Sequence, residues 1–265
     1  AASDVYKRQQ QRSLLALQKA EKMKKQAFAD RYPYGIFSCI RTMGHIYKSR
    51  GNFDLSAQYY QEALDYMLKN MPDQDPSQLY SSLAEYYRNT QKDYATALDY
   101  CEKALKSAKT ERNIAQAMIE KCLVLFRQGR IDEFNDCYKE AVQMADRCKL
   151  SASVSLLIAH ISKNILDKQY EQAHAHADQL SEKGLQQHAY IYECAKDYPN
   201  AIKYLKKYHQ QLDSTNNLLQ LSDIAELNTQ IGAERLKMEN IQATSRYRIT
   251  LFSIVTGFLL LSLLF

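Results

Sequence analysis

Apolar and small side chains recur along this chain at helical spacing, and the whole pattern returns roughly every 34 to 40 residues. Recurrence at such a period predicts stacked helical hairpins, each of which buries its apolar face against the next one. The most legible copy reads Met43-Gly44-x2-Tyr47-x3-Gly51-x-Phe53-x2-Ser56-x3-Tyr60-x2-Ala63.

This copy runs from about 35 to 68, and its residue types have separate predicted roles. Gly44 lets the two helices approach closely, and Gly51 turns the chain between them. Large side chains are expected to fill the space between the helices, and one small residue keeps the second helix close: Tyr47, Phe53, Tyr60 and, as the small residue, Ala63.

Further copies follow, and an amphipathic helix over Gln11–Ala29 precedes them, with a break at Tyr32-Pro33-Tyr34-Gly35. The second copy has one extra residue in its turn, and the fourth is weaker than the others. The characteristic residues are Leu83, Ala84, Tyr87, Tyr94, Ala97, Cys101 and Ala104 in the second copy; Cys122, Leu125, Gly129, Ile131, Phe134, Tyr138 and Ala141 in the third; Tyr170, Ala173, Ala177 and Leu180 in the fourth; and Tyr192, Tyr198, Ala201, Leu205 and Tyr208 in the fifth.

A long polar helix is predicted from Leu218 to Arg248, after the last copy. Two arrangements fit this helix: a coiled-coil seam between two copies of the chain, and a lone helix folded back on the repeats. The apolar residues at a and d positions of one heptad frame are Ile224, Leu227, Ile231, Met238 and Ile241, with Glu234 and Ser245 interrupting the frame.

Ile249 to Phe265 carries no charged residue and is apolar on every face. As a helix it reaches about 26 Å, against a hydrocarbon core of about 30 Å, so we expect a transmembrane helix cut slightly short. The alternative is a buried terminal helix of the repeats. Arg246 and Arg248 precede the segment, and the positive-inside tendency alone would place the repeats in the cytoplasm.

Composition agrees with an all-α chain, because 7 Gly and 4 Pro in 265 residues leave few turns. The 35 basic and 30 acidic residues, a formal net charge of +5, are interleaved along the helices. That distribution is a solvated surface and lacks the basic stripe that a nucleic-acid partner requires, so no nucleic-acid partner is expected.

No catalytic, metal or cofactor site is predicted in this chain. The sequence lacks a glycine-rich phosphate loop, a nucleophile elbow and zinc-ligand spacing, and His174 and His176 are expected to point to different faces of one helix. The six cysteines form no CxxC pair, and Cys101 and Cys122 fall on packing positions, where cysteine acts as a small apolar residue. The spacing of the cysteines does not decide whether two of them form a disulfide.

The first nine residues are not expected to belong to the fold. Asp4 to Gln9 resembles the translation of a transposon-end adaptor used in preparing sequencing libraries, so 1–9 are expected to be an artefact. The true N-terminus is then expected to be missing.

The repeated residues resemble the tetratricopeptide repeat family, which carries a small residue and an aromatic in its first helix and a spaced Tyr, Ala, aromatic and Ala in its second. The resemblance covers about Gln11 to Asp213. Ser56 and Phe134 depart from it, since alanine is usual there, and the chain has no tryptophan. The resemblance implies an α-solenoid of helical hairpins that binds a protein or peptide segment on the concave face of the first helices.

By register, six side chains are expected to face that groove: Arg41, His45 and Lys48 from the first repeat, and Ser81, Glu85 and Arg88 from the second. The family members that bind chaperone tails use Lys and Asn where Arg41 and His45 stand, so their carboxylate clamp is not expected here. For each of the six residues a solvated surface charge or polar group is the alternative interpretation.

The end of the chain is similar to the tetratricopeptide sensor proteins of Bacteroidetes, in which a long helix with Ala-Glu-Leu-x-Thr precedes a membrane span. The matching stretch here is Ile224-Ala225-Glu226-Leu227-Asn228-Thr229-Gln230. This similarity implies the sensor region of a single-span signal-transduction protein, with periplasmic repeats in the inner membrane of a bacterium, feeding a missing cytoplasmic histidine kinase or regulator. A tail-anchored, cytoplasm-facing adaptor and a membrane scaffold without signalling output are the alternatives.

The predicted layout has four parts. Residues 1–9 are adaptor-derived, and 10–213 form a solenoid of about five repeats plus a partial N-terminal helix. Residues 214–248 form the linker helix, through which the chain is expected to form a homodimer, and 249–265 form the truncated transmembrane helix.

Overall fold

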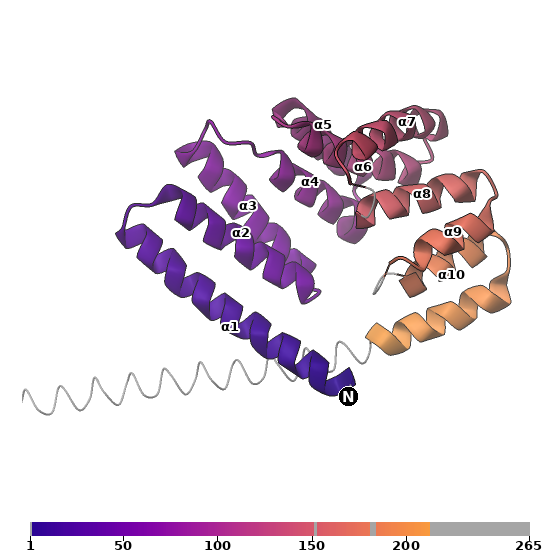
Figure 1. Ribbon diagram of the computed structural model, residues 1–265, viewed down its shortest axis with the longest axis horizontal. Coiled ribbons are helices and arrows are strands. Elements are labelled where there is room, and N and C mark those ends of the chain that lie inside the picture. Colours follow the sequence, from indigo (N-terminus) through magenta and orange to yellow (C-terminus); the bar gives the residue numbers. More distant parts are fainter. Residues whose placement is uncertain (1, 151–152, 181–183, 213–265) are drawn as a thin grey trace, which may run out of the picture. The chain divides into compact units, whose positions relative to one another are not determined.

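The computed structural model describes residues 2–150, 153–180 and 184–212, and helices make up all the regular structure of these residues (Figure 1). Side chains are described from Leu15 onward. The elements are α1 (Ala2–Ala29), α2 (Pro33–Ser49), α3 (Phe53–Asn70), α4 (Ser77–Tyr86), η1 (Tyr87–Gln91), α5 (Tyr94–Ser107), α6 (Glu111–Arg127), α7 (Ile131–Arg147), α8 (Val154–Leu166), α9 (Tyr170–Ala177) and α10 (Gly184–Cys194), followed by a helix over 198–212.

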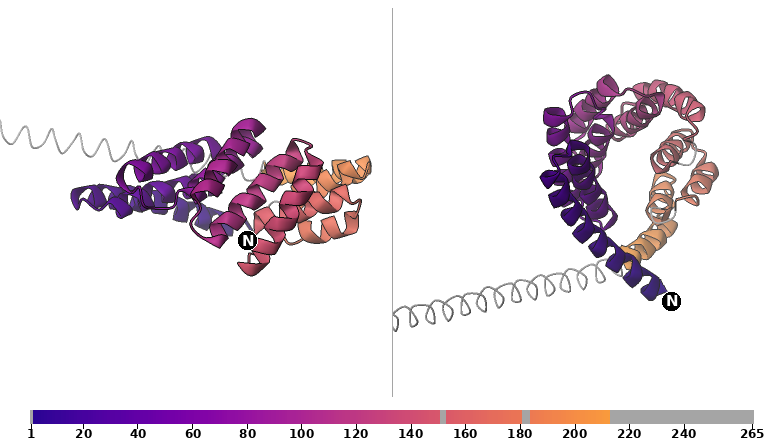
Figure 2. Two further views of the ribbon diagram at one scale, coloured as in Figure 1. Left: turned by 90° about the horizontal axis from the view of Figure 1, so that it is seen from above. Right: turned by 60° about the vertical axis from the view of Figure 1, so that its left-hand side comes forward.

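The predicted hairpins are present in the compact unit Arg12–Ser214. α2 packs on α3, α4 on α5, α6 on α7 and α8 on α9, and the first helices of neighbouring hairpins contact each other, α4 with α6 and α6 with α8 (Figures 1 and 2). α1 is longer than the predicted Gln11–Ala29 helix, since it begins at Ala2. Ala1–Gln11 and Thr215–Phe265 form a second unit, most of which lies outside the described residues.

Side-chain and backbone signals explain where these helices begin and turn. Asn52, Asp93 and Thr110 each accept a hydrogen bond from a backbone N–H in the first turn of the helix that follows, which caps α3, α5 and α6. Gly51 turns the first hairpin with a φ of +75°, as the sequence predicts. The same left-handed conformation is taken by lysine in three other hairpins, Lys92, Lys168 and Lys196.

The extra residue of the second repeat is accommodated by η1, one turn of π-helix between α4 and Lys92. A π-helical turn holds one more residue than an α-helical turn, so it absorbs an insertion without breaking the helix. The first helix of this hairpin therefore stays in line with its neighbours despite the insertion.

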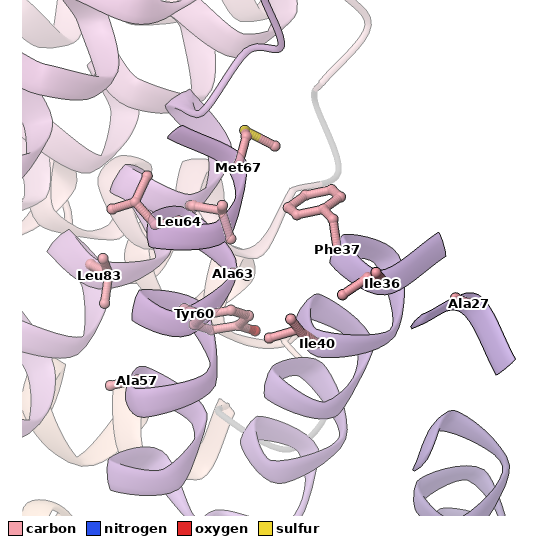
Figure 3. Packing of buried hydrophobic residues seen from close by; sticks show 11 residues of the cluster. Ala27, Ile36, Phe37, Ile40, Ala57, Tyr60, Ala63, Leu64, Met67 and Leu83 are labelled. Atoms are coloured by element: carbon pink, nitrogen blue, oxygen red, sulfur yellow. The ribbon is translucent and has the colours of Figure 1, made fainter. Parts of the chain in front are cut away.

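The core of the first hairpin forms where α2 and α3 face each other (Figure 3). Phe37 and Ile40 of α2 lie on the side that faces Tyr60 and Ala63 of α3. The same cluster continues to Ala27 of α1 beyond α2 and to Leu83 of α4 beyond α3. The predicted burial of Tyr60, Ala63, Cys101 and Cys122 is confirmed. The prediction for Phe53 is wrong, because this ring is 48% exposed at the first residue of α3; Leu15 and Met23 of α1 are also exposed.

Gly44 is the point of closest contact between α2 and α3. A Cβ there would lie 2.7 Å from two ring atoms of Tyr60, and the hydroxyl of Ser56 donates a 2.9 Å hydrogen bond to the carbonyl of Gly44. Ser56 is buried, so its departure from the usual alanine is explained by a polar contact across the hairpin that an alanine could not make.

Gly44→Ala should lower the free energy of unfolding by about 1 to 3 kcal/mol, because the added methyl must displace the buried Tyr60 ring. Urea denaturation followed by circular dichroism measures it, with Thr42→Ala on the exposed side of α2 as the control. A Gly44→Ala protein as stable as the control would contradict this packing.

The predicted linker helix over 214–248 and the predicted transmembrane helix over 249–265 lie outside the described residues. Among the residues that are described, none of the helices combines the length and apolar character needed to cross a membrane.

Candidate functional site

Charged side chains link the first helices of three successive hairpins. Nζ of Lys48 on α2 lies 2.5 Å from Oε2 of Glu85 on α4, and Nε of Arg88 in η1 lies 2.6 Å from Oε1 of Glu120 on α6. The side chains of Arg88 and Glu120 are each 5% exposed, whereas Lys48 and Glu85 are half-buried. Three of the six predicted groove residues are therefore already paired across repeats.

The electrostatics of these pairs follow from burial and from their neighbours. Burial alone would lower the pKa of Lys48, but the Glu85 carboxylate outweighs it and raises that pKa. Arg88 behaves in the same way, since Glu120 overcomes the effect of burial and raises its pKa. Burial raises the pKa of Glu120 against the opposing effect of Arg88. Near neutral pH the positive charges of Lys48 and Arg88 are thus each paired with a carboxylate of the same chain.

His45 lies on α2 between Arg41 and Lys48 and contacts the second helix of its own hairpin. Its Nδ1 is 2.9 Å from the hydroxyl of Tyr60, and the two rings meet edge to face with centroids 5.3 Å apart. Burial lowers the pKa of His45, and the positive charges of Arg41 and Lys48 lower it further. His45 is therefore a neutral, oriented side chain at neutral pH.

The imidazole of His45 should titrate with a midpoint below its ordinary value of about 6.5. Because the unfolded chain takes up this proton first, the stability contributed by neutral His45 is full above about pH 6.5 and declines as pH falls toward the folded-state pKa. An NMR titration of the imidazole resonances measures the midpoint, and the same titration in urea is the control. A folded-state midpoint at or above the urea value would contradict this environment.

Arg41 differs from the other cations of the site. Its guanidinium lies over the ring of Phe37, 5.2 Å from the ring centroid, and its Nε is buried without a hydrogen-bond partner among the described residues. A buried donor left unsatisfied costs about 1 to 3 kcal/mol, so a shift of the half-buried Arg41 side chain that gave Nε an acceptor would be favourable. Ser81, the sixth predicted residue, is half-buried on α4, one turn before Glu85.

The structure brings together residues that the sequence did not link to the site. Glu120 completes the charged row, and it follows Arg88 by 32 positions, so no local spacing signals the pair. The hydroxyl of Tyr138 on α7 lies 2.6 Å from Nδ1 of His160 on α8, so this tyrosine meets a histidine of the next hairpin, whereas Tyr60 meets His45 of its own hairpin. The sequence pattern indicates the tyrosines in the second helices, but it does not indicate which histidines they contact.

Histidines gather between the later hairpins, on α8, α9 and α10. As predicted, His174 and His176 face different neighbours: Nδ1 of His174 is 2.7 Å from Nδ1 of His188, whereas the His176 ring stacks on His160. In the described part of the chain, no group of three or more His, Cys, Asp or Glu side chains has an arrangement suited to a metal ion.

Residues 41–75, which span the second half of α2 and all of α3, match the model of the tetratricopeptide repeat family. Among solved structures, the crystal structure of BtubC (BKLC) from P. vanneervenii is similar, with a TM-score of 0.49 and 16% identity over 78% of this chain and 92% of that chain. No curated protein matches the chain as a relative. The family match supports the tetratricopeptide interpretation of the hairpins and, with it, a role in protein–protein interaction.

Proposed function

We propose that this chain binds an extended segment of a partner protein along the first helices of its hairpins, with Arg41 as the principal contact. The observation that carries the proposal is the half-buried guanidinium of Arg41, which lies over the Phe37 ring and whose Nε has no hydrogen-bond partner among the described residues. A guanidinium held in place loses little freedom on binding, so its hydrogen bond to an incoming oxygen is pre-organised. The partner must supply that oxygen, from a backbone carbonyl or a carboxylate.

The paired residues have a different role in this proposal. Lys48 with Glu85 and Arg88 with Glu120 hold the first three hairpins at fixed positions relative to one another, since each pair joins two neighbouring repeats. Their charges are compensated within the chain, so they position the groove and contribute little charge to partner recognition. His45 is exposed and Ser81 is half-buried, and both are polar positions of the proposed groove.

The test begins with a peptide selected from a random display library on the full chain in detergent micelles. Isothermal titration calorimetry then compares the wild type with Arg41→Ala and with Arg147→Ala, an exposed arginine on α7. Losing a hydrogen bond to a charged group should weaken binding by about tenfold or more in Arg41→Ala, whereas Arg147→Ala should stay within about twofold. Equal losses in the two variants would place the binding site elsewhere.

For the whole protein, we propose the sensor region of a single-span membrane receptor whose repeats lie in the periplasm. The support is the order of the segments: repeats, a long helix with Ala225-Glu226-Leu227-Asn228-Thr229, and the charge-free 249–265. In this scheme partner binding changes a homodimer of the 214–248 helix, and the span carries the change to a cytoplasmic kinase or regulator.

A second candidate is a tail-anchored adaptor or scaffold that faces the cytoplasm. It is favoured by Arg246 and Arg248, which precede the apolar segment as cytoplasmic flanks do. Sequencing the gene beyond Phe265 separates the two. A Lys- and Arg-rich flank followed by a dimerisation helix with a histidine and by ATP-binding motifs supports the sensor, whereas a stop codon at that point supports the adaptor.

A further inference from the structure

Two cysteines meet inside the third hairpin. Sγ of Cys122 on α6 lies 2.8 Å from Sγ of Cys137 on α7, and Cys137 also lies 3.5 Å from the carbonyl of Met118. A disulfide requires a sulfur–sulfur distance of about 2.05 Å, so closing this pair needs a movement of less than about 1 Å. The two thiols belong to adjacent helices that already pack on each other.

The two thiols are chemically unequal. Cys122 is fully buried, and its hydrogen bond to Cys137 and its burial both raise its pKa. Cys137 is partly exposed, and the hydrogen bond from Cys122 lowers its pKa, with Lys121 acting in the same direction. A lowered pKa and access to solvent are what an attacking thiol needs, and a second thiol 2.8 Å away is close enough to resolve the product.

We propose that Cys122 and Cys137 form a reversible redox site that a small-molecule or protein disulfide oxidises to an intramolecular bond between α6 and α7. The Cys137 thiolate attacks one sulfur of the incoming disulfide and displaces its other half as a thiolate, which leaves a mixed disulfide on Cys137. Cys122 then attacks Sγ of Cys137 while its proton passes to the departing second half, which leaves as a thiol. The two cysteines lose two electrons and two protons, and the incoming disulfide is reduced to two thiols.

This site is independent of the proposed partner groove. Glu120 and Cys122 are two positions apart on α6, so they lie on nearly opposite faces of the helix. Oxidation should therefore staple the third hairpin while leaving the Arg88–Glu120 pair in place. The two proposals then have separate outcomes, since a failure to oxidise says nothing about binding at Arg41.

The test treats the reduced full chain with excess glutathione disulfide, blocks free thiols with N-ethylmaleimide and maps tryptic peptides by mass spectrometry. Peptides 122–127 and 131–139 should appear linked, with two hydrogens lost, and the melting temperature should rise by roughly 5 to 10 °C and return after dithiothreitol. Cys137→Ser should abolish both effects, and Cys148→Ser, the matched control, should retain both.

Three results would overturn the site. The first is a Cys122 that remains free while Cys137 carries only glutathione, and the second is a linked peptide that joins either residue to Cys101 or to another cysteine. The third is unchanged alkylation of both thiols after treatment. Because the linkage is measured in the wild-type protein, the result does not depend on the folding of any variant.

Discussion

Glu120→Ala should lower the free energy of unfolding by about 3 to 5 kcal/mol, since it leaves the Arg88 guanidinium buried without its carboxylate. Arg88 keeps its 2.7 Å hydrogen bond to Asn89, but a neutral amide oxygen does not compensate a buried positive charge. Chemical denaturation of the full chain, followed by far-ultraviolet circular dichroism, measures the loss.

Two further variants identify the cause. Lys103→Ala removes the exposed Lys103–Asp99 pair on α5 and should change stability by no more than about 0.5 kcal/mol. Replacing both members of the buried pair, Arg88→Met with Glu120→Leu, should recover most of the stability, because no buried charge is left alone. A Glu120→Ala protein that loses no more than Lys103→Ala would show that Arg88 has access to water.

Phe134→Ala is the second large effect, and we expect a loss of about 3 to 5 kcal/mol. The Phe134 ring is 0% exposed at the start of α7, with its centroid 5.5 Å from that of Phe126 and 5.6 Å from that of Tyr138. Truncation removes apolar contacts and leaves a cavity between two rings that are held by their own helices.

Phe53→Ala is the matched control. Both phenylalanines lie in the first turn of the second helix of a hairpin, but the Phe53 ring is half exposed and the Phe134 ring is buried. The free energy of unfolding of Phe53→Ala should fall by no more than about 1 kcal/mol. Thermal and urea denaturation of both variants measure the difference. Similar losses in the two would mean that the third hairpin collapses around the missing ring or that Phe53 is buried by a contact outside the described residues.

Helix positions were predictable because they depend on spacing within one hairpin. Tyr60 and Ala63 fall on the buried side of α3 by helical periodicity, and Cys101 occupies the equivalent side of α5. Phe53 was not predictable in this way, because the first residue of a helix extends beyond the overlap with its partner helix. The left-handed lysines were also missed, since lysine carries no local signal for a positive φ.

The candidate site depends on contacts between repeats, which no local pattern encodes. Register placed Lys48 and Glu85 on first helices, but their pairing depends on the offset between neighbouring hairpins. The Arg88–Glu120 pair needs the η1 turn as well, which keeps Arg88 buried despite the extra residue. Cys122 and Cys137 illustrate the same limit, because their approach requires the packing of α6 on α7.

Photo-crosslinking tests most directly whether a partner segment lies along the first helices. A photoreactive benzoylphenylalanine replaces Ser81, at the middle of the proposed groove, or Lys139, exposed on α7, and each protein is irradiated with the library-selected peptide. We expect a covalent adduct from position 81 and none from position 139. Equal labelling at both positions, or labelling from position 139 alone, would contradict this placement of the segment.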